Sequence, residues 1–163
     1  MKCRDEKYLD STVSPQAARI QAEIERSGGT PETFNRLGVL YARYGMLAEA
    51  RDAFEKALAV DKGYVPTLIN MGNVYYVREN MDRALEYYER AYENDPENTR
   101  VILNIARVNH SLENYGIVKQ YYDRLVSADP ELASQFSYLL LRGEEAKRGA
   151  EVVEMHSFVI WTE

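Results

Sequence analysis

The sequence of 163 residues contains few of the residues that usually indicate redox chemistry, metal binding or attraction to polyanions. It has one cysteine, one tryptophan and two histidines, and its net charge is −6. The single cysteine, Cys3, can form no internal disulfide and cannot by itself build a zinc site. The excess of acidic residues disfavours binding to nucleic acid or to anionic lipid, because both usually need a basic protein face.

Long apolar runs and catalytic motifs are also missing. No apolar run reaches the roughly 18 residues that would span a membrane, and the chain begins with no leader-like pattern. We find no nucleophile motif, glycine-rich phosphate loop or metal-ligand spacing. The sequence therefore predicts a non-enzymatic protein with no cofactor and no metal, located in the cytoplasm. In an alternative interpretation, Cys3 is the acylated residue of an exported lipoprotein that lacks its leader.

What the sequence does contain is a period of 34 residues. The period is visible in a column of aspartates, a column of aromatic residues and a column of small residues. These are Asp61, Asp95 and Asp129; Phe54, Tyr88 and Tyr122; and Gly38, Gly72 and Ala106. A fixed period of this length indicates one small supersecondary unit that is repeated, each copy burying an apolar face against its neighbours.

The period divides the centre of the chain into three units, residues 31–64, 65–98 and 99–132. Each unit has two segments of about a dozen residues with apolar side chains at helical spacing. A short polar break around Gly45, Glu79 or Glu113 separates the two segments, and an aspartate marks the end of each unit. The unit is therefore predicted to be helix, turn, helix.

The flanks, residues 1–30 and 133–163, do not follow the period. We expect an aperiodic start over residues 1–13, then a capping helix that opens at Ser14 and Pro15 and ends at Gly28. After Pro130 an apolar stripe predicts a solvating C-terminal helix, which is followed by an apolar tail.

The third unit also departs from the other two. It carries Val118 and Leu125 where the others carry alanine. The larger side chains predict either a splayed helix pair or a different helix packed there.

The columns resemble the signature of the tetratricopeptide repeat family. In the first two units the matching positions are Phe34, Leu37, Gly38, Tyr41, Ala50, Phe54 and Ala57, and then Met71, Gly72, Tyr75, Ala84, Tyr88, Ala91 and Pro96. The third unit is degenerate, with Asn109 in place of the tyrosine. The resemblance implies an all-α fold, a right-handed α-solenoid of helix-turn-helix repeats with flanking capping helices. It also implies a concave groove that takes peptides, and hence an adaptor or scaffold.

The groove face of the first helix in each unit carries several amides and cations although the chain is acidic overall. We expect the peptide-binding groove to contain Asn35, Arg43, Asn70, Asn73, Tyr76, Arg100, Asn104, Arg107 and His110. Asparagine can pair with the main chain of a ligand, and arginine can hold a carboxylate. The predicted partner is therefore a protein segment that is acidic or has a free C-terminus.

Some relatives hold the C-terminal carboxylate of heat-shock chaperones in a clamp of lysines, asparagines and an arginine. The resemblance places those positions at Asn35, Val39, Asn70, Arg100 and Asn104. Only Asn70 matches in kind, and Arg100 keeps the charge. A chaperone-type clamp is therefore not predicted, whereas a looser groove of asparagine and arginine is.

The last residues are too apolar for a solvated tail, with Phe158, Val159, Ile160 and Trp161 in succession. The tail is predicted to dock on its own repeats, to bind a neighbouring molecule in a homodimer, or to stay undocked. Docking in the groove would make it a built-in competitor of a peptide partner. Two other functions remain open: a self-associating scaffold, and an accessory domain of a larger enzyme or transport complex. The sequence does not identify the partner.

Overall fold

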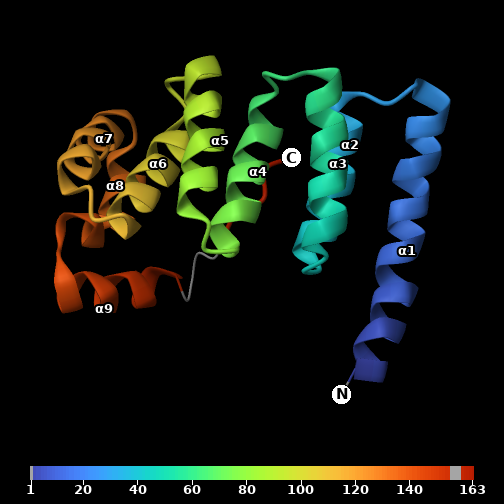
Figure 1. The fold of residues 1–163 in the computed structure, drawn as a ribbon, viewed down its shortest axis with the longest axis horizontal. Coiled ribbons are helices and arrows are strands. Elements are labelled where there is room, and N and C mark those ends of the chain that lie inside the picture. The colour runs from blue at the N-terminus through green and yellow to red at the C-terminus, as the bar shows by residue number, and fades with distance from the viewer. Residues whose placement is uncertain (1, 155–158) are drawn as a thin grey trace. The chain divides into compact units, whose positions relative to one another are not determined.

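The computed structural model describes residues 2–154 and 159–163, and the described part is helical, with no strand (Figure 1). Its elements, in chain order, are α1 (Lys2–Ser27), α2 (Pro31–Arg43), α3 (Leu47–Val60), α4 (Val65–Val77), α5 (Met81–Asn94), α6 (Thr99–Ser111), α7 (Tyr115–Ala128), α8 (Pro130–Gln135), the 3-10 helix η1 (Ser137–Leu140) and α9 (Gly143–Glu154).

The helices keep the 34-residue register of the sequence in all three pairs. The first helices begin at residues 31, 65 and 99, and the second helices at residues 47, 81 and 115. Each intervening turn has a residue with positive φ at the equivalent position: Gly45 (74°), Glu79 (58°) and Glu113 (60°). Glycine adopts this conformation freely, whereas glutamate does so at a cost. The turn geometry is therefore maintained even where the favoured residue is absent.

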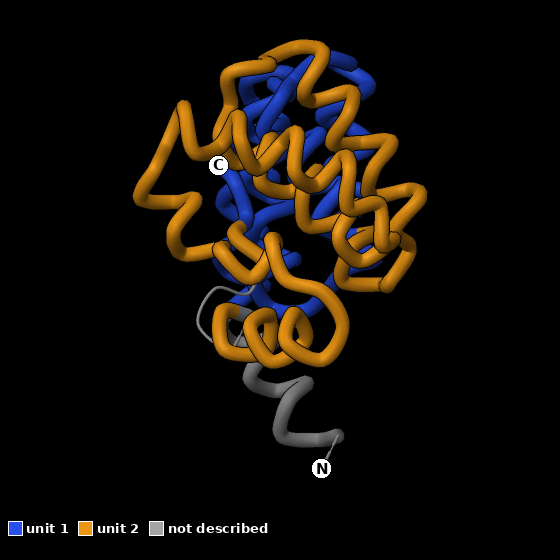
Figure 2. The backbone as a smooth tube through the Cα atoms, turned by 90° about the vertical axis from the view of Figure 1, so that its left-hand side faces the viewer, with its two compact units in different colours: residues 1–74, 161–163 blue, residues 75–160 orange. Residues whose placement is uncertain are grey.

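The chain divides into two compact units (Figure 2). Unit 1 comprises residues 1–74 together with residues 161–163, and unit 2 comprises residues 75–160. The boundary falls within α4, and the last three residues of the chain belong to the unit formed by the first half.

In unit 1, α1 is longer than the sequence predicts. It begins at Lys2 rather than at Ser14, and it continues through Pro15. A proline inside a helix costs about 3 kcal/mol because it removes a hydrogen bond and crowds the preceding turn. Val13 and Ala17, on either side of Pro15, are buried in a cluster with Leu37 and Leu40 of α2. Burial of such side chains contributes about 1.5–3 kcal/mol each for the larger ones, which offsets the proline.

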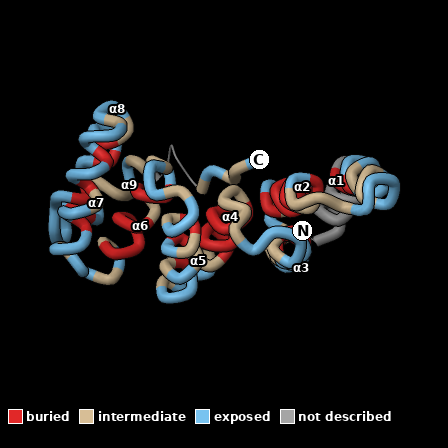
Figure 3. The backbone as a smooth tube through the Cα atoms, turned by 90° about the horizontal axis from the view of Figure 1, so that it is seen from above, coloured by how far each residue is buried: buried red, intermediate tan, exposed pale blue. Residues whose placement is uncertain are grey.

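The helices α2 and α3 pack closely because Gly38 has no side chain. A Cβ placed on Gly38 would lie 2.3 Å from a ring carbon of Phe54. The Phe54 ring is fully buried, as are Ala50 and Ala57 one helical turn before and after it on α3. Figure 3 shows the resulting buried stretch of α2. The glycine at this position of the repeat thus lets the Phe54 ring of α3 lie directly on the backbone of α2.

In unit 2, a different segment packs against the enlarged positions of the third helix pair. Val118 and Leu125 of α7 lie in one core cluster with Ala133, Phe136 and Leu139. The second of the two alternatives posed by the sequence is therefore the observed one. The segment after Pro130 fills the space that the large side chains require.

That segment is not the continuous helix that the apolar stripe predicts, and this prediction was wrong. The helix α8 ends after six residues, and the 3-10 helix η1 follows it. Phe136 and Tyr138 are both buried. Both rings lie in the core cluster that contains Val118 and Leu125. After η1 the chain starts again as α9.

The Gly38 contact predicts opposite effects of alanine at two helical glycines. Gly38→Ala should lower the free energy of unfolding by about 1–2 kcal/mol, because overpacking against Phe54 outweighs the gain in helix propensity. Gly116→Ala in α7 should raise it by a few tenths to about 1 kcal/mol, because nothing lies within 4 Å of the added Cβ. Urea denaturation of both variants measures the difference. Equal effects at the two sites would contradict the close approach of α2 and α3.

Candidate functional site

A site with several polar contacts lies in unit 1, where the chain end runs beside α4 (Figure 1). We call residues Trp161–Glu163 the C-terminal segment. The side-chain amide of Asn70 makes two hydrogen bonds to the main chain of Thr162. Its Nδ2 donates to the Thr162 oxygen at 2.7 Å, and its Oδ1 accepts from the Thr162 N–H at 2.8 Å. One asparagine therefore satisfies both main-chain groups of one residue, as a neighbouring β-strand would.

Asn35 of α2 completes the arrangement. Its Nδ2 donates to the same Thr162 oxygen at 2.8 Å, and its Oδ1 accepts from Asn70 Nδ2 and from Thr67 Oγ1, each at 2.9 Å. We call Asn35, Thr67 and Asn70 the amide site. All three residues are fully buried. Since a buried amide that lacks a partner is costly, the network fixes the orientation of both asparagines.

Two further contacts flank the amide site. The Trp161 ring stacks on Phe54 of α3, with ring centroids 6.4 Å apart and an interplanar angle of 21°. On the other side, Nη2 of Arg43 lies 2.8 Å from a carboxylate oxygen of Glu163. The segment is therefore held by an aromatic contact, then by main-chain hydrogen bonds, and then by an ion pair. Beside Glu163 is a cavity of about 200 Å³ lined by Gln16, Ile20, Arg36, Leu40, Arg43 and Glu163.

Three of the nine residues assigned to the groove from the sequence meet around this segment: Asn35, Arg43 and Asn70. The sequence reasoning missed Thr67 and Phe54. Phe54 was assigned to the core column, and it lies there, but it also supports Trp161. The sequence carries only a weak signal for Thr67, because the equivalent position 34 residues earlier is also threonine, Thr33. In the structure both threonines are buried. Its role as a donor to Asn35 depends on how α2 and α4 pack.

In unit 2, two of the predicted groove residues pack together instead of lining a polar surface. The guanidinium carbon of Arg107 lies 4.9 Å from the ring centroid of Tyr76 and 5.8 Å from that of Phe136. Arg107 is only 8% exposed. Its charge is thus placed between aromatic faces, where a cation–π contact is strong because water is largely excluded. Arg107 contributes to the packing of unit 2.

The remaining predicted residues lie in several environments. His110 donates from Nε2 to the Leu141 main-chain oxygen at 3.1 Å, and its ring is nearly perpendicular to those of Tyr115 and Tyr138, at 84° to each. Asn73 is buried, Asn104 is half-buried and Arg100 is exposed. In the predicted docking tail, Val159 is half-buried and Ile160 is exposed, while Phe158 lies outside the described residues.

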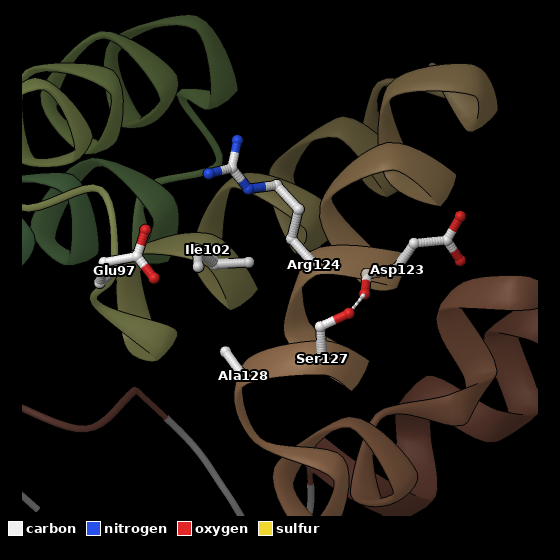
Figure 4. A pocket seen from close by; sticks show the side chains of 6 residues that line it. All are labelled: Glu97, Ile102, Asp123, Arg124, Ser127 and Ala128. Atoms are coloured by element: carbon white, nitrogen blue, oxygen red, sulfur yellow. Dashed lines mark hydrogen bonds between the residues drawn. The ribbon is translucent and has the colours of Figure 1, made fainter.

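Hollows also occur in the described part of unit 2. The first, of about 390 Å³, is lined by Glu97, Ile102, Asp123, Arg124, Ser127 and Ala128 (Figure 4). Glu97 and Asp123 lie on opposite sides of it, and the Ser127 hydroxyl donates to the Asp123 main-chain oxygen at 3.0 Å (Figure 4). The second, of about 300 Å³, adjoins His110 and α9. In the first hollow, the separated carboxylates and the tied hydroxyl do not form an acid–base or nucleophile pair.

The shifted pKa values near these residues follow from burial and hydrogen bonding. Burial raises the pKa of Tyr88, beside Arg107, well above its usual value. The Thr30 side chain forms a hydrogen bond with the exposed Glu32 carboxylate and lowers its pKa. Both shifts move the pKa values further from neutral pH, so Tyr88 stays neutral and Glu32 stays charged at that pH.

The described residues form neither a membrane-crossing helix nor a cluster of metal ligands. Within them, no helix combines the length and the apolar character needed to cross a membrane. In that part of the chain, no cluster of three or more His, Cys, Asp or Glu side chains is placed to hold a metal ion.

Comparison with known proteins gives matches to repeat families and to solved structures. Two family models, both described as tetratricopeptide repeat, match residues 31–64 and residues 65–98. These bounds are those of the first two units of the sequence period. No match was found among curated proteins.

Several solved structures share the fold. A tetratricopeptide repeat protein from Parabacteroides merdae is 18% identical with a TM-score of 0.72, and the alignment covers 93% of this chain and 63% of that chain. Pseudomonas aeruginosa pilF is 17% identical with a TM-score of 0.67, over 94% of this chain and 73% of that chain. The first TPR of Spaghetti (RPAP3), bound to the HSP90 peptide SRMEEVD, is 16% identical with a TM-score of 0.60, over 77% and 90%.

At these identities the structural likeness shows the fold alone, and the chain spans 63% of the length of the Parabacteroides protein. The family-model matches and the preserved 34-residue helix pairs carry the assignment further. Residues 31–98 match the tetratricopeptide repeat family, and the chain has the all-α fold of helical repeats seen in the solved tetratricopeptide repeat structures.

Proposed function

We propose that the protein is a non-enzymatic interaction module whose amide site binds an extended peptide segment through its main chain. In this chain the site holds the C-terminal segment, which acts as a resident ligand. The observation that carries the proposal is the pair of hydrogen bonds between Asn70 and the main chain of Thr162. The docking that the sequence left open among three alternatives is thus proposed to be intramolecular.

A buried amide site suits this task because it is complete only when a peptide main chain, or water in its place, is present. Asn70 is fully buried, so removal of Thr162 would leave a donor and an acceptor to be satisfied. Each unsatisfied buried group costs about 1–3 kcal/mol. The site therefore favours any extended segment that presents an N–H and a C=O in place of those of Thr162.

The flanking charge supports an acidic ligand. Arg43 contacts Glu163, and Arg36 lines the adjoining cavity. Both side chains of the Arg43–Glu163 pair are more than half exposed, so the ion pair contributes at most about 1 kcal/mol and weakens with salt. A protein of the same fold binds the acidic peptide SRMEEVD, which is consistent with this preference. The charge tunes affinity, whereas the amide site supplies the binding mode.

Removal of the resident ligand should expose the site. Deletion of residues 160–163 is expected to tighten binding of an added peptide with the sequence of residues 159–163, by about ten-fold or more. The reason is that a tethered segment competes at an effective concentration in the millimolar range. Isothermal calorimetry on both forms measures the change. Unchanged affinity would contradict the resident-ligand proposal, and a particle mass that falls on deletion would show that the segment binds a second copy instead.

Replacement of Asn70 tests the binding mode directly. In the deleted chain, Asn70→Ala should weaken binding of the same peptide roughly ten-fold or more, because two main-chain hydrogen bonds are lost. Asn104→Ala is the matched control, since Asn104 occupies the equivalent position one repeat later. It should change affinity little. Equal losses in the two variants would contradict the assignment of the site to Asn35 and Asn70.

The two arginines assigned to the groove in unit 2 should differ in kind. Arg107→Ala is expected to lower the free energy of unfolding by about 2–3 kcal/mol, because it removes a buried cation between two aromatic rings. Arg100→Ala, at an exposed position, should stay within about 0.5 kcal/mol of wild type. Thermal or urea denaturation compares them. If the Arg107→Ala chain is stable but binds acidic peptide less well, Arg107 contributes to peptide binding instead of packing.

A further inference from the structure

The three residues of the C-terminal segment meet three different kinds of contact, and each contact selects a different property of a ligand. Resting on the proposed function, this arrangement allows the preferred sequence of a partner peptide to be derived from the segment that occupies the site.

The middle position is recognised through its main chain. Asn70 accepts the Thr162 N–H, and Asn70 and Asn35 both donate to its oxygen. These groups are common to every residue except proline, which has no N–H. The middle position should therefore accept many side chains but exclude proline.

The preceding position is recognised through an aromatic face. Trp161 is half-buried and stacks on Phe54, which is itself fixed against Gly38 of α2. Stacked aromatic pairs contribute beyond the area that they bury, and truncation of a central aromatic anchor is among the costliest changes at an interface. A ligand should therefore carry an aromatic residue here.

The following position is recognised through charge. Arg43 contacts the Glu163 carboxylate, and the cavity beside it contains a second arginine, Arg36. Arg36 is partly compensated by Glu23, whose carboxylate lies 3.1 Å from its guanidinium. The cavity also gives room for a further ligand residue beyond the acidic one.

We propose that the partner of the amide site is an extended protein segment of the form aromatic, any residue except proline, acidic, and that this segment displaces Trp161–Glu163. The C-terminal segment is then a copy of the partner sequence carried by the chain itself. A bound partner replaces the contacts of the C-terminal segment with equivalent contacts of its own. The effective concentration of the tethered segment therefore sets the concentration that a partner must exceed to displace it.

The full-length chain provides its own probe, because Trp161 is the sole tryptophan. Thr162→Pro should move the tryptophan emission to the longer wavelength of a water-exposed indole, since it removes the N–H that Asn70 accepts. Thr162→Ala is the matched control and should leave the emission unchanged. If the two variants emit alike, the middle position is not read through its N–H.

The Thr162→Pro chain, with its site open, then serves to measure peptides. A fluorescein-labelled Val-Ile-Phe-Thr-Glu should bind in fluorescence anisotropy, and more tightly than to the wild-type chain. Replacing Phe by Ala, or Thr by Pro, should weaken binding roughly ten-fold or more. Replacing Glu by Lys should weaken it up to about five-fold at low salt, with the difference shrinking as salt is added.

The outcomes separate the sequence preference from the proposed function. If the Ala-containing peptide binds as tightly as the Phe-containing one, the aromatic preference is overturned, while the loss of binding in Asn70→Ala would still support main-chain recognition. If the Pro-containing peptide also binds equally well and Asn70→Ala has no effect, the proposed function itself fails.

Discussion

The close approach of α2 and α3 at Gly38 is the constraint on which both the first repeat and its site depend. A Cβ on Gly38 would lie 2.3 Å from the Phe54 ring, so any larger residue at this position must push the ring or the helix away. The same ring is the surface on which Trp161 stacks. The absence of a side chain at Gly38 therefore sets the distance between α2 and α3. It also sets the position of the Phe54 ring, which contacts the C-terminal segment.

The amide site shows how a helical repeat can bind an extended chain without offering a strand. Asn35 and Asn70 stand on two different helices, and their side chains present donors and an acceptor in the pattern of a strand edge. Because both residues are buried and bonded to each other, their amides are orientated before a ligand arrives. Such preorganisation reduces the ordering cost of binding, which favours main-chain recognition even of a short segment.

The site does not recur along the array, because equivalent positions carry different side chains. One repeat after Asn35 the chain has Ile69, and one repeat after Asn70 it has Asn104. The pair of amides is therefore present once in the register, at the junction of the first and second repeats. Arg107 of unit 2, one repeat after Asn73, has a different environment and lies between Tyr76 and Phe136. The repeats share one backbone arrangement, but the side chains on their groove faces differ and so does what these faces can bind.

The sequence by itself determined the helix pairs, their 34-residue register and their turns, because apolar spacing and small columns are local patterns that every copy repeats. It also selected Asn35, Asn70 and Arg43 as groove residues from their chemistry. Tertiary structure decided that α1 continues through Pro15, since burial of Val13 and Ala17 against α2 offsets the proline, and that the segment after Pro130 packs on α7 with Phe136 and Tyr138 in one core. It alone brought Thr162 to Asn70, 92 residues away in the chain. The apolar composition of the tail predicts that it is buried. The site that accepts it, however, forms only when α2, α3 and α4 have packed together.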